Sequence, residues 1–324
     1  LTSSMIIFGQ GAIRPHTCLL KEKNAVSGIA NSRARRVFDN ALFTHVGFSI
    51  SNMVRSLFLG LTGSRMTPAP VSGPHAQYFR QLSRMSSAFA FLADSVLVLL
   101  GGKFKFKEKL SGRLADALIH LYMGSAMLKR FEDNGRPDSD LPLLIWGMED
   151  SLFTIQQSLL GVIRNFPVPF LSRLVQLIVF PLGLPHSGPS DKTVKAVAKI
   201  LLNESECRDR LTDGVFISDR DDATGLVNKA FHLVLEAAPA ERAIKNALKE
   251  PVNFENYEGL VKRATESGVI TEEQATMVRL AQRASARVIA VDDFPPDKVA
   301  EPVDEVPDAM PESETGVREQ TSVM

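Results

Sequence analysis

Two carboxylates and one histidine are the first residues whose type and spacing allow chemistry. Asp116 and His120 stand four positions apart in a helical segment, so their side chains can meet on one face. An oriented histidine is a general base, but the sequence places no serine or cysteine nucleophile near it. Asp94 stands among apolar residues, where an unpaired charge is costly, so we expect an ion pair with Arg84 or Arg113. We interpret both groups as structural pairs and identify no catalytic residue.

Two short motifs resemble binding sites but fail on spacing. The segment 219–224 begins like a calcium loop, yet Ala223 and Thr224 stand where that loop requires an oxygen ligand and a glycine. The Gly-x-Gly at 9–11 lacks the preceding strand, the third glycine and the downstream acid of a dinucleotide site. We interpret the first as a polar turn and the second as a place of close helix packing.

Two clusters of basic residues can contact an anionic partner. The members of the first are Lys21, Lys23, Arg33, Arg35 and Arg36. The members of the second are Lys103, Lys105, Lys107, Lys109 and Arg113, with Phe104 and Phe106 interleaved. Basic residues that alternate with aromatic ones bind nucleic acid or an anionic membrane surface. The plainer interpretation is a solvated helix start.

The apolar stretch 162–184 is the second candidate for contact with a membrane. Its prolines limit it to a short helix over about 170–180, whose apolar positions include Phe170, Leu174 and Ile178. Such a helix can lie in a bilayer interface or serve as an ordinary core helix, and the sequence leaves both interpretations open.

Charge and cysteine content narrow the class of protein. The chain has 37 Lys plus Arg against 37 Asp plus Glu, so nothing in its balance favours nucleic acid. Cys18 and Cys207 form no CxxC pair, which favours a reducing compartment and predicts no metal site. No segment reaches the roughly 20 apolar residues of a membrane-spanning helix. The best candidate, 88–100, is short and contains Asp94.

Apolar residues recur every three or four positions over 82–99, 110–131 and 144–163, which predicts three long helices. Short loops join them, so we expect an up-and-down bundle over about 74–165. Gly101 and Gly102 are expected to end the first of these helices. Asp138 or Ser139 is expected to cap the third helix, Ser190 a later one, and 271–274 forms a capping box. The predicted fold class is therefore all-α.

Four regions are expected along the chain. Residues 1–30 form the last helix of a bundle that begins upstream, because Leu1 reads as a position within a helix. Residues 31–72 form a helical connector and 73–294 an accessory helical domain. Residues 295–324 hold five prolines and eight acidic residues, which predicts a disordered acidic tail.

Ten sequence runs resemble bacterial long-chain acyl-CoA dehydrogenases of the FadE type. These are 4–14, 114–116, 126–131, 140–143, 146–147, 165–167, 179–181, 189–192, 197–201 and 291–294. The resemblance therefore covers nearly the whole chain up to the tail. These runs belong to the C-terminal extension of this type of enzyme, so the resemblance implies an all-helical accessory domain.

The resemblance implies an FAD-dependent enzyme of fatty-acid β-oxidation. Such enzymes oxidise a fatty acyl-CoA to the trans-2-enoyl-CoA, and an electron-transferring flavoprotein reoxidises the flavin. The glutamate that removes the α-proton belongs to a Val-Glu-Gly-Ala-Asn-type motif that is absent here, so no catalytic or FAD-binding residue is carried over. We expect this segment alone to be inactive and to bind no FAD.

The segment's own role is then dimer packing or docking on the inner membrane face of a bacterial cell, in a protein that otherwise lies in the cytoplasm. The contact residues would be the four lysines Lys103, Lys105, Lys107 and Lys109 together with Phe170, Leu174 and Ile178. A free-standing helical interaction or membrane-surface module without enzymatic role is the alternative. A nucleic-acid-binding protein is a third interpretation, which rests only on the basic clusters, and we expect no nucleic-acid partner.

Overall fold

The computed structural model describes residues 16–26, 31–218, 220, 222–249 and 256–290. Every regular element in these ranges is a helix and none is a strand, which confirms the predicted all-α class. The chain divides into two compact units, residues 1–213 and 214–324, and each is described here by itself. The four-part division expected from the sequence stays a prediction, and its tail, 295–324, lies outside the described ranges.

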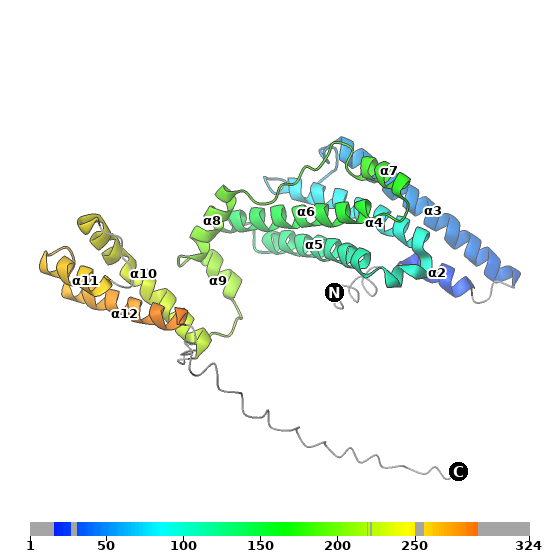
Figure 1. Cartoon of the computed structure of the whole chain (residues 1–324). Helices are drawn as coiled ribbons and strands as arrows, with labels where there is room; N and C mark the ends of the chain where they lie inside the picture. Colours follow the sequence, from blue (N-terminus) through cyan, green and yellow to red (C-terminus); the bar gives the residue numbers. More distant parts are fainter. Residues whose placement is uncertain (1–15, 27–30, 219, 221, 250–255, 291–324) are drawn as a thin grey trace, which may run out of the picture. The chain divides into compact units, whose positions relative to one another are not determined.

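Three long helices form the centre of the first unit. They are α4 (Ala76–Leu100), α5 (Glu108–Asp133) and α6 (Leu141–Arg164), joined by the short 3-10 segments η2 (Gly101–Phe106) and η3 (Asp138–Asp140). Figure 1 shows α5 and α6 side by side along most of their length, and this pair makes the most extensive contact in the unit. The predicted bundle over 74–165 is thus present.

The core of the bundle consists of the apolar positions whose spacing predicted the helices. Its fully buried members include Met85, Leu92, Leu114, Leu128, Met148, Leu152, Ile155, Leu159 and Ile163. Each is removed from water against the neighbouring helices, and burial of one such side chain contributes roughly 1.5–3 kcal/mol. The bundle is therefore held mainly by the apolar faces of α4, α5 and α6.

The residues that end or cap the helices are those predicted from the sequence, with one exception. Gly101 closes α4 with a φ of 49°, a left-handed backbone that glycine adopts without a steric penalty. Ser190 caps α8 (Asp191–Leu201) by accepting the amide hydrogen of Thr193. The predicted cap of α6 is wrong: Asp138 belongs to η3, and the capping position is Asp140, whose side chain makes no cap hydrogen bond. The backbone turns once as a 3-10 helix before α6 begins.

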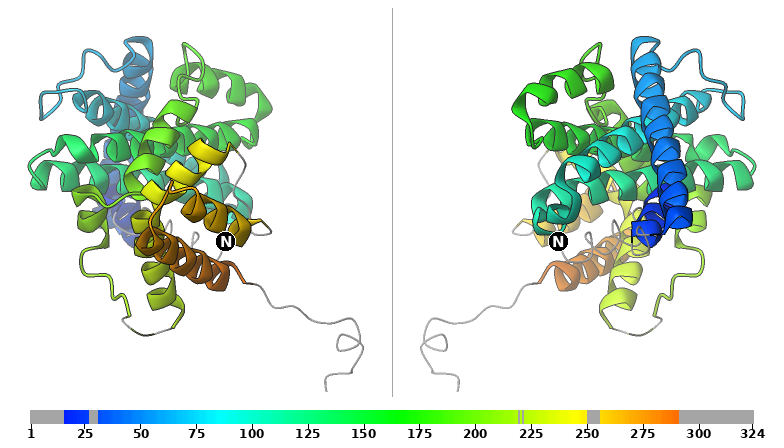
Figure 2. Two further views of the ribbon diagram at one scale, coloured as in Figure 1. Left: turned by 90° about the vertical axis from the view of Figure 1, so that its left-hand side faces the viewer. Right: turned by 90° about the vertical axis from the view of Figure 1, so that its right-hand side faces the viewer.

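Two outer helices complete this side of the unit. The helices α2 (Thr17–Val26) and α3 (Ser32–Leu61) pack against each other, and α3 also contacts α4 and α7 (Pro169–Val179). Figure 2 shows α3 as a long blue helix on the outside of the bundle. At its end, a Cβ on Gly60 would lie 2.7 Å from the ring of Pro181, so a glycine lets the two segments approach this closely.

One described helix, α4, is long and apolar enough to cross a membrane by length and composition alone. The sequence predicted no membrane-spanning helix, because its best candidate, 88–100, is too short. The helix in the structure is longer than this candidate, since the apolar pattern extends over the whole of α4. The helix contributes Met85, Leu92 and Val96 to the core of the bundle. We therefore describe it as a core helix.

The second unit is a small group of three helices with its own core. They are α10 (Ala223–Leu248), α11 (Tyr257–Glu266) and α12 (Glu272–Ile289). Thr271 and Gln274 form the predicted capping box at the start of α12. The buried hydroxyl of Tyr257 donates a hydrogen bond to the carbonyl of Val278, which joins α11 to α12. Small residues such as Ala264, Ala275 and Ala281 allow these helices to pack closely.

Candidate functional site

The apolar stretch 162–184 presents one face to the core and another to solvent. Val175 and Val179 of α7 are buried, and Ile178 packs against the core of the bundle. On the opposite face, Phe170 is 81% exposed and Leu174 is 50% exposed. The core interpretation thus holds for Val175, Val179 and Ile178, and membrane contact by the exposed residues Phe170 and Leu174 stays a prediction.

The lysine cluster lies at the turn between α4 and α5. Lys103, Lys107 and Lys109 are exposed, while the side chain of Lys105 lies outside the described set. Phe104 is buried and anchors η2, whereas Phe106 is exposed. The cluster therefore surrounds the first turn of α5 with positive charge, where only Glu108 opposes it.

The tertiary structure brings the lysine cluster to the loop that precedes α7. A surface hollow of about 700 Å³ is lined by Lys107, Lys109 and Arg113 on α5 and its approach, and by Asn165 and Pro167 after α6. Pro167 stands three positions before Phe170 in the chain. The lysines and the start of α7 therefore share one end of the bundle, although more than 50 positions separate them in the sequence.

A third surface, which sequence reasoning missed, is the exposed apolar stripe of α3. It consists of Phe43, Val46, Ile50, Val54, Phe58 and Leu61. These residues follow one another in steps of three or four, so they lie on one face of the helix. Every member is at least 44% exposed, and Phe43 is 75% exposed. The stripe is about 27 Å long at 1.5 Å per residue.

The stripe was hard to find because its apolar spacing equals that of a core face. A helix that buries such a face and a helix that exposes it carry the same sequence signal. In α3 the few buried positions are small or polar except Leu59; the others are Ala41, His45, Ser56 and Gly60. The uncommon feature is a contiguous apolar surface in water, which marks interaction sites.

The buried carboxylate of Asp94 is paired with histidines, not with arginine as expected. Its Oδ1 lies 3.4 Å from Nε2 of His16 and 3.7 Å from Nε2 of His45. Its Oδ2 accepts a hydrogen bond of 2.9 Å from the hydroxyl of Ser49. Neither histidine was considered from sequence, because 29 and 49 positions separate the three residues and no motif spacing connects them.

The predicted carboxylate–histidine pair on α5 does not form a catalytic arrangement. Asp116 is exposed. His120 instead faces the hydroxyl of Ser151 on α6, with Nδ1 and Oγ 3.5 Å apart. Asp222 of the rejected calcium loop caps α10 by accepting the amide hydrogen of Gly225. Asp219, Asp221 and the Gly-x-Gly at 9–11 lie outside the described residues.

A smaller, apolar hollow of about 300 Å³ lies beside Trp146, between α5, α6 and α9 (Glu206–Thr212). At its rim, the guanidinium of Arg210 holds the pKa of Asp140 below its usual range. Burial, with a smaller contribution from Asp140, raises the pKa of the Cys207 thiol to about 11. The thiol is therefore protonated at neutral pH and is no nucleophile.

The sequence was also compared with known protein families. Residues 13–294 match the family described as acyl-CoA dehydrogenase, C-terminal, bacterial type. The chain belongs to this family. The match spans both compact units, so the exposed stripe of α3 and the α7 face are parts of the family domain. No solved structure matches the chain.

Neither of the two hollows described above fits FAD. A flavin ring requires a flat slot with apolar walls, whereas the 700 Å³ hollow has charged walls and its aromatic residue, Phe106, is exposed. The apolar hollow beside Trp146, about 300 Å³, is at the lower limit for a drug-sized ligand, and FAD is larger. We therefore derive no chemical step through flavin from these side chains.

Proposed function

We propose that this chain is the C-terminal part of an FAD-dependent acyl-CoA dehydrogenase of fatty-acid β-oxidation. The whole enzyme would oxidise a fatty acyl-CoA to the trans-2-enoyl-CoA and pass its electrons to an electron-transferring flavoprotein in the bacterial cytoplasm. Family membership supports this proposal. The glutamate and the flavin site would belong to another part of the enzyme, because the Val-Glu-Gly-Ala-Asn-type motif does not occur in this sequence.

Within that enzyme, we infer that the family domain holds two copies of the chain together. The observation that carries this inference is the exposed stripe of α3. Six large apolar side chains on one 30-residue helix form a surface that is costly in water. Two such stripes are self-complementary when two copies meet around a two-fold axis, which is the commonest symmetry of homo-oligomers.

The stripe alone covers less than the roughly 800 Å² per partner of a standard interface, so it would form the apolar centre of a larger contact. Polar and charged residues flank it, among them Arg55 within α3 and Arg33, Arg35 and Arg36 in its first turns. An apolar centre with a polar rim is the usual composition of a protein interface.

The triple variant Phe43→Ser, Ile50→Ser, Phe58→Ser tests this proposal. These side chains are exposed, so the variant is expected to keep its helix content. We expect the purified chain to be a dimer and the variant to dissociate at least about 100-fold more readily, because three large apolar contacts are removed. Light scattering after size exclusion, over a range of protein concentrations, measures this.

The matched control is the pair Tyr122→Ser, Met123→Ser, which removes exposed apolar side chains from α5 instead. It should leave the mass of the particle unchanged. A wild-type chain that remains monomeric at every concentration, or a triple variant that dimerises as well as the control, would refute the role of the stripe.

Docking on a membrane is a second candidate function, because the lysine cluster and the exposed face of α7 share one end of the bundle. An apolar helix face beside several lysines is suited to the interface of an anionic bilayer. We therefore expect the chain to float with vesicles that contain an anionic phospholipid at low salt, and less well at moderate salt.

Two variants separate charge from insertion in the flotation assay. Lys103→Glu, Lys107→Glu, Lys109→Glu should abolish flotation at both salt concentrations, and Phe170→Ser, Leu174→Ser should weaken it at least about tenfold. Ile178 is retained because it packs against the core. Vesicles of neutral lipid are the control. Absence of wild-type flotation on anionic vesicles would leave dimer packing through the stripe of α3 as the sole proposed role of the family domain.

The alternative from a different class is a free-standing helical interaction module. It shares the exposed stripe and the α7 face with the proposal but needs no dehydrogenase partner. Purification of the family domain from its native source distinguishes the two. Recovery with FAD and acyl-CoA dehydrogenase activity in the same particle would support the enzyme, and recovery without them would support the module.

A further inference from the structure

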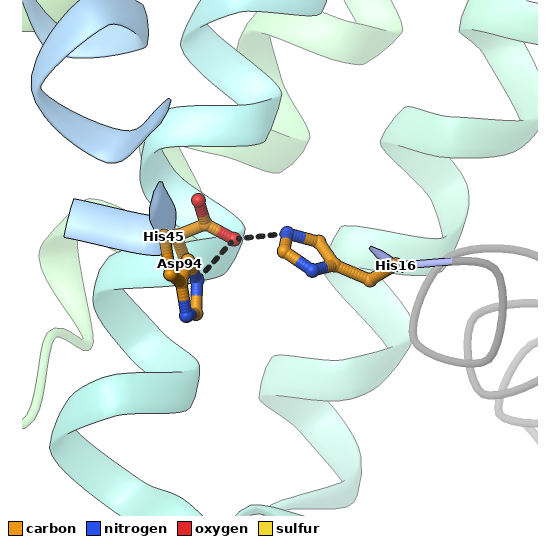
Figure 3. Close-up of side chains that lie close together, drawn as sticks. All are labelled: His16, His45 and Asp94. Carbon is orange, nitrogen blue, oxygen red and sulfur yellow. Dashed lines mark ion pairs between the residues drawn. The ribbon is translucent and has the colours of Figure 1, made fainter. Parts of the chain in front are cut away.

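Two histidines and one aspartate converge in the first unit, outside the surfaces considered so far. His16 directly precedes α2, His45 lies in α3 and Asp94 lies in α4. Figure 3 shows both imidazole rings directed at the same carboxylate oxygen. One ligand atom from each residue lies within 4.8 Å of the other two, and the side chains are 17%, 5% and 4% exposed, respectively.

Two of the three side chains are also held from their other side. Glu22 Oε1 lies 2.9 Å from Nδ1 of His45, and Ser49 holds the second oxygen of Asp94. Contacts of this kind, beyond the ligands themselves, fix the orientation of metal-binding imidazoles and carboxylates. His16 differs, because its Nδ1 accepts the amide hydrogen of Leu19 at 3.2 Å.

The inward-facing atoms remain unsatisfied. Nε2 of His16 and Nε2 of His45 are buried and have no hydrogen-bond partner of acceptable geometry. When His45 donates its Nδ1 hydrogen to Glu22, the lone pair on its Nε2 faces the negative Oδ1 of Asp94. Two such electron-rich atoms repel each other in a buried site, so a positive charge between them would remove this unfavourable electrostatic energy.

We propose that His16, His45 and Asp94 bind one divalent cation of the Zn²⁺ class, with water as the fourth ligand. Two imidazoles, one carboxylate and an open position form a known zinc donor set. Ligands about 2.0–2.1 Å from a tetrahedral ion lie roughly 3.3–3.5 Å from one another. The separations of 3.4 Å and 3.7 Å to Asp94 Oδ1 are close to this value, and the three ligand atoms all lie within 4.8 Å of one another, so side-chain movements would complete the site.

Binding has a defined consequence for His16. A cation on Nε2 moves the imidazole hydrogen to Nδ1, which then no longer accepts the amide hydrogen of Leu19. In exchange, the cation links the start of α2 to α3 and α4. The proposed site is therefore structural, and it fixes the N-terminal helix against the bundle.

The test uses the full chain without a histidine tag, stripped with a chelator and titrated with Zn²⁺ against a chromophoric competitor. We expect one ion per chain with a dissociation constant of about 1 μM or lower, and a Co²⁺ form with the visible absorption of four-coordinate cobalt. Saturating Zn²⁺ should raise the melting temperature by about 5 °C or more.

Variants separate this site from adventitious binding. His16→Gln removes the most exposed ligand and should weaken Zn²⁺ binding at least about 100-fold while the helix content is retained. Glu22→Gln, which removes the group that orients His45, should weaken it about tenfold. His120→Gln, a histidine outside the cluster, is the matched control and should bind like the wild type.

Two results would overturn the proposal. The first is a wild-type chain that binds no stoichiometric Zn²⁺ at micromolar concentration. The second is a folded His16→Gln variant with unchanged affinity and cobalt spectrum. Either result would mean that His16, His45 and Asp94 do not form a metal site.

Discussion

Replacement of Asp94 by alanine is expected to lower the free energy of unfolding of the first unit by about 3 kcal/mol or more. The carboxylate is 3% exposed and is the common neighbour of His16, His45 and Ser49. Its removal leaves the hydroxyl of Ser49 without its acceptor and Nε2 of His16 without the carboxylate that faces it, and each such buried polar group costs roughly 1–3 kcal/mol. Urea denaturation followed by circular dichroism measures the change.

The measurement is made with a chelator present, so that loss of a bound metal ion does not contribute. Asp116→Ala is the matched control, because Asp116 is an exposed carboxylate on a helix of the same unit. It should change stability by less than about 0.5 kcal/mol. Asp94→Asn keeps one acceptor oxygen and should fall between the two. A loss below about 1 kcal/mol for Asp94→Ala would contradict the structural role.

The second large effect is expected from acidification, through His186. Burial, with a smaller contribution from the charge of Arg84, lowers the pKa of His186 from 6.5 to about 4. The unfolded chain therefore binds a proton below about pH 6.5, while the folded chain does not bind it until about pH 4. The resulting stability is fully present above pH 6.5 and is lost as the pH falls toward 4.

The expected loss between pH 7 and pH 4.5 is about 2 to 3 kcal/mol from this residue. The matched variant is His186→Leu, which fills the space but cannot titrate. The backbone of residue 186 remains fixed in it, because the side chain of Gln156 binds both the amide and the carbonyl of that residue. Urea denaturation at the two pH values measures both proteins.

The difference between the two proteins isolates the contribution of His186 from that of every other group that titrates between pH 7 and pH 4.5. We expect the stability of the wild type to fall by about 2 to 3 kcal/mol more than that of His186→Leu. Parallel losses in both proteins would show that His186 is protonated in the folded state at the same pH as in the unfolded chain.

The sequence by itself determined the helices of this protein. The apolar residues of 82–99, 110–131 and 144–163 recur with the period of a helix, and the structure buries them in one core. Glycine, proline and capping residues end or begin helices through local backbone preferences, so Gly101, Ser190 and Thr271 were predicted correctly. The cap of α6 was wrong because a 3-10 turn, which no residue preference distinguishes there, displaced it.

Only the tertiary structure decided which apolar faces are covered. The stripe of α3 and the buried face of α6 have the same spacing, and a sequence contains no record of which one meets a neighbour. For the same reason the stretch 162–184 remained ambiguous until α7 was seen to bury Val175 and expose Phe170. Burial requires a second surface that covers the first, whereas the periodicity of a sequence identifies only the apolar face of a single helix.

The cluster at Asp94 shows the same limit for polar residues. The sequence established that a carboxylate among apolar residues needs a partner, because an unpaired buried charge is costly. It did not identify the partner, since the sequence contains both arginines and histidines and does not show which of them lies near Asp94 in the fold. The packing of α2 and α3 against α4 brought His16 and His45 to Asp94 across 78 and 49 positions, and only three-dimensional contact makes such distant residues neighbours.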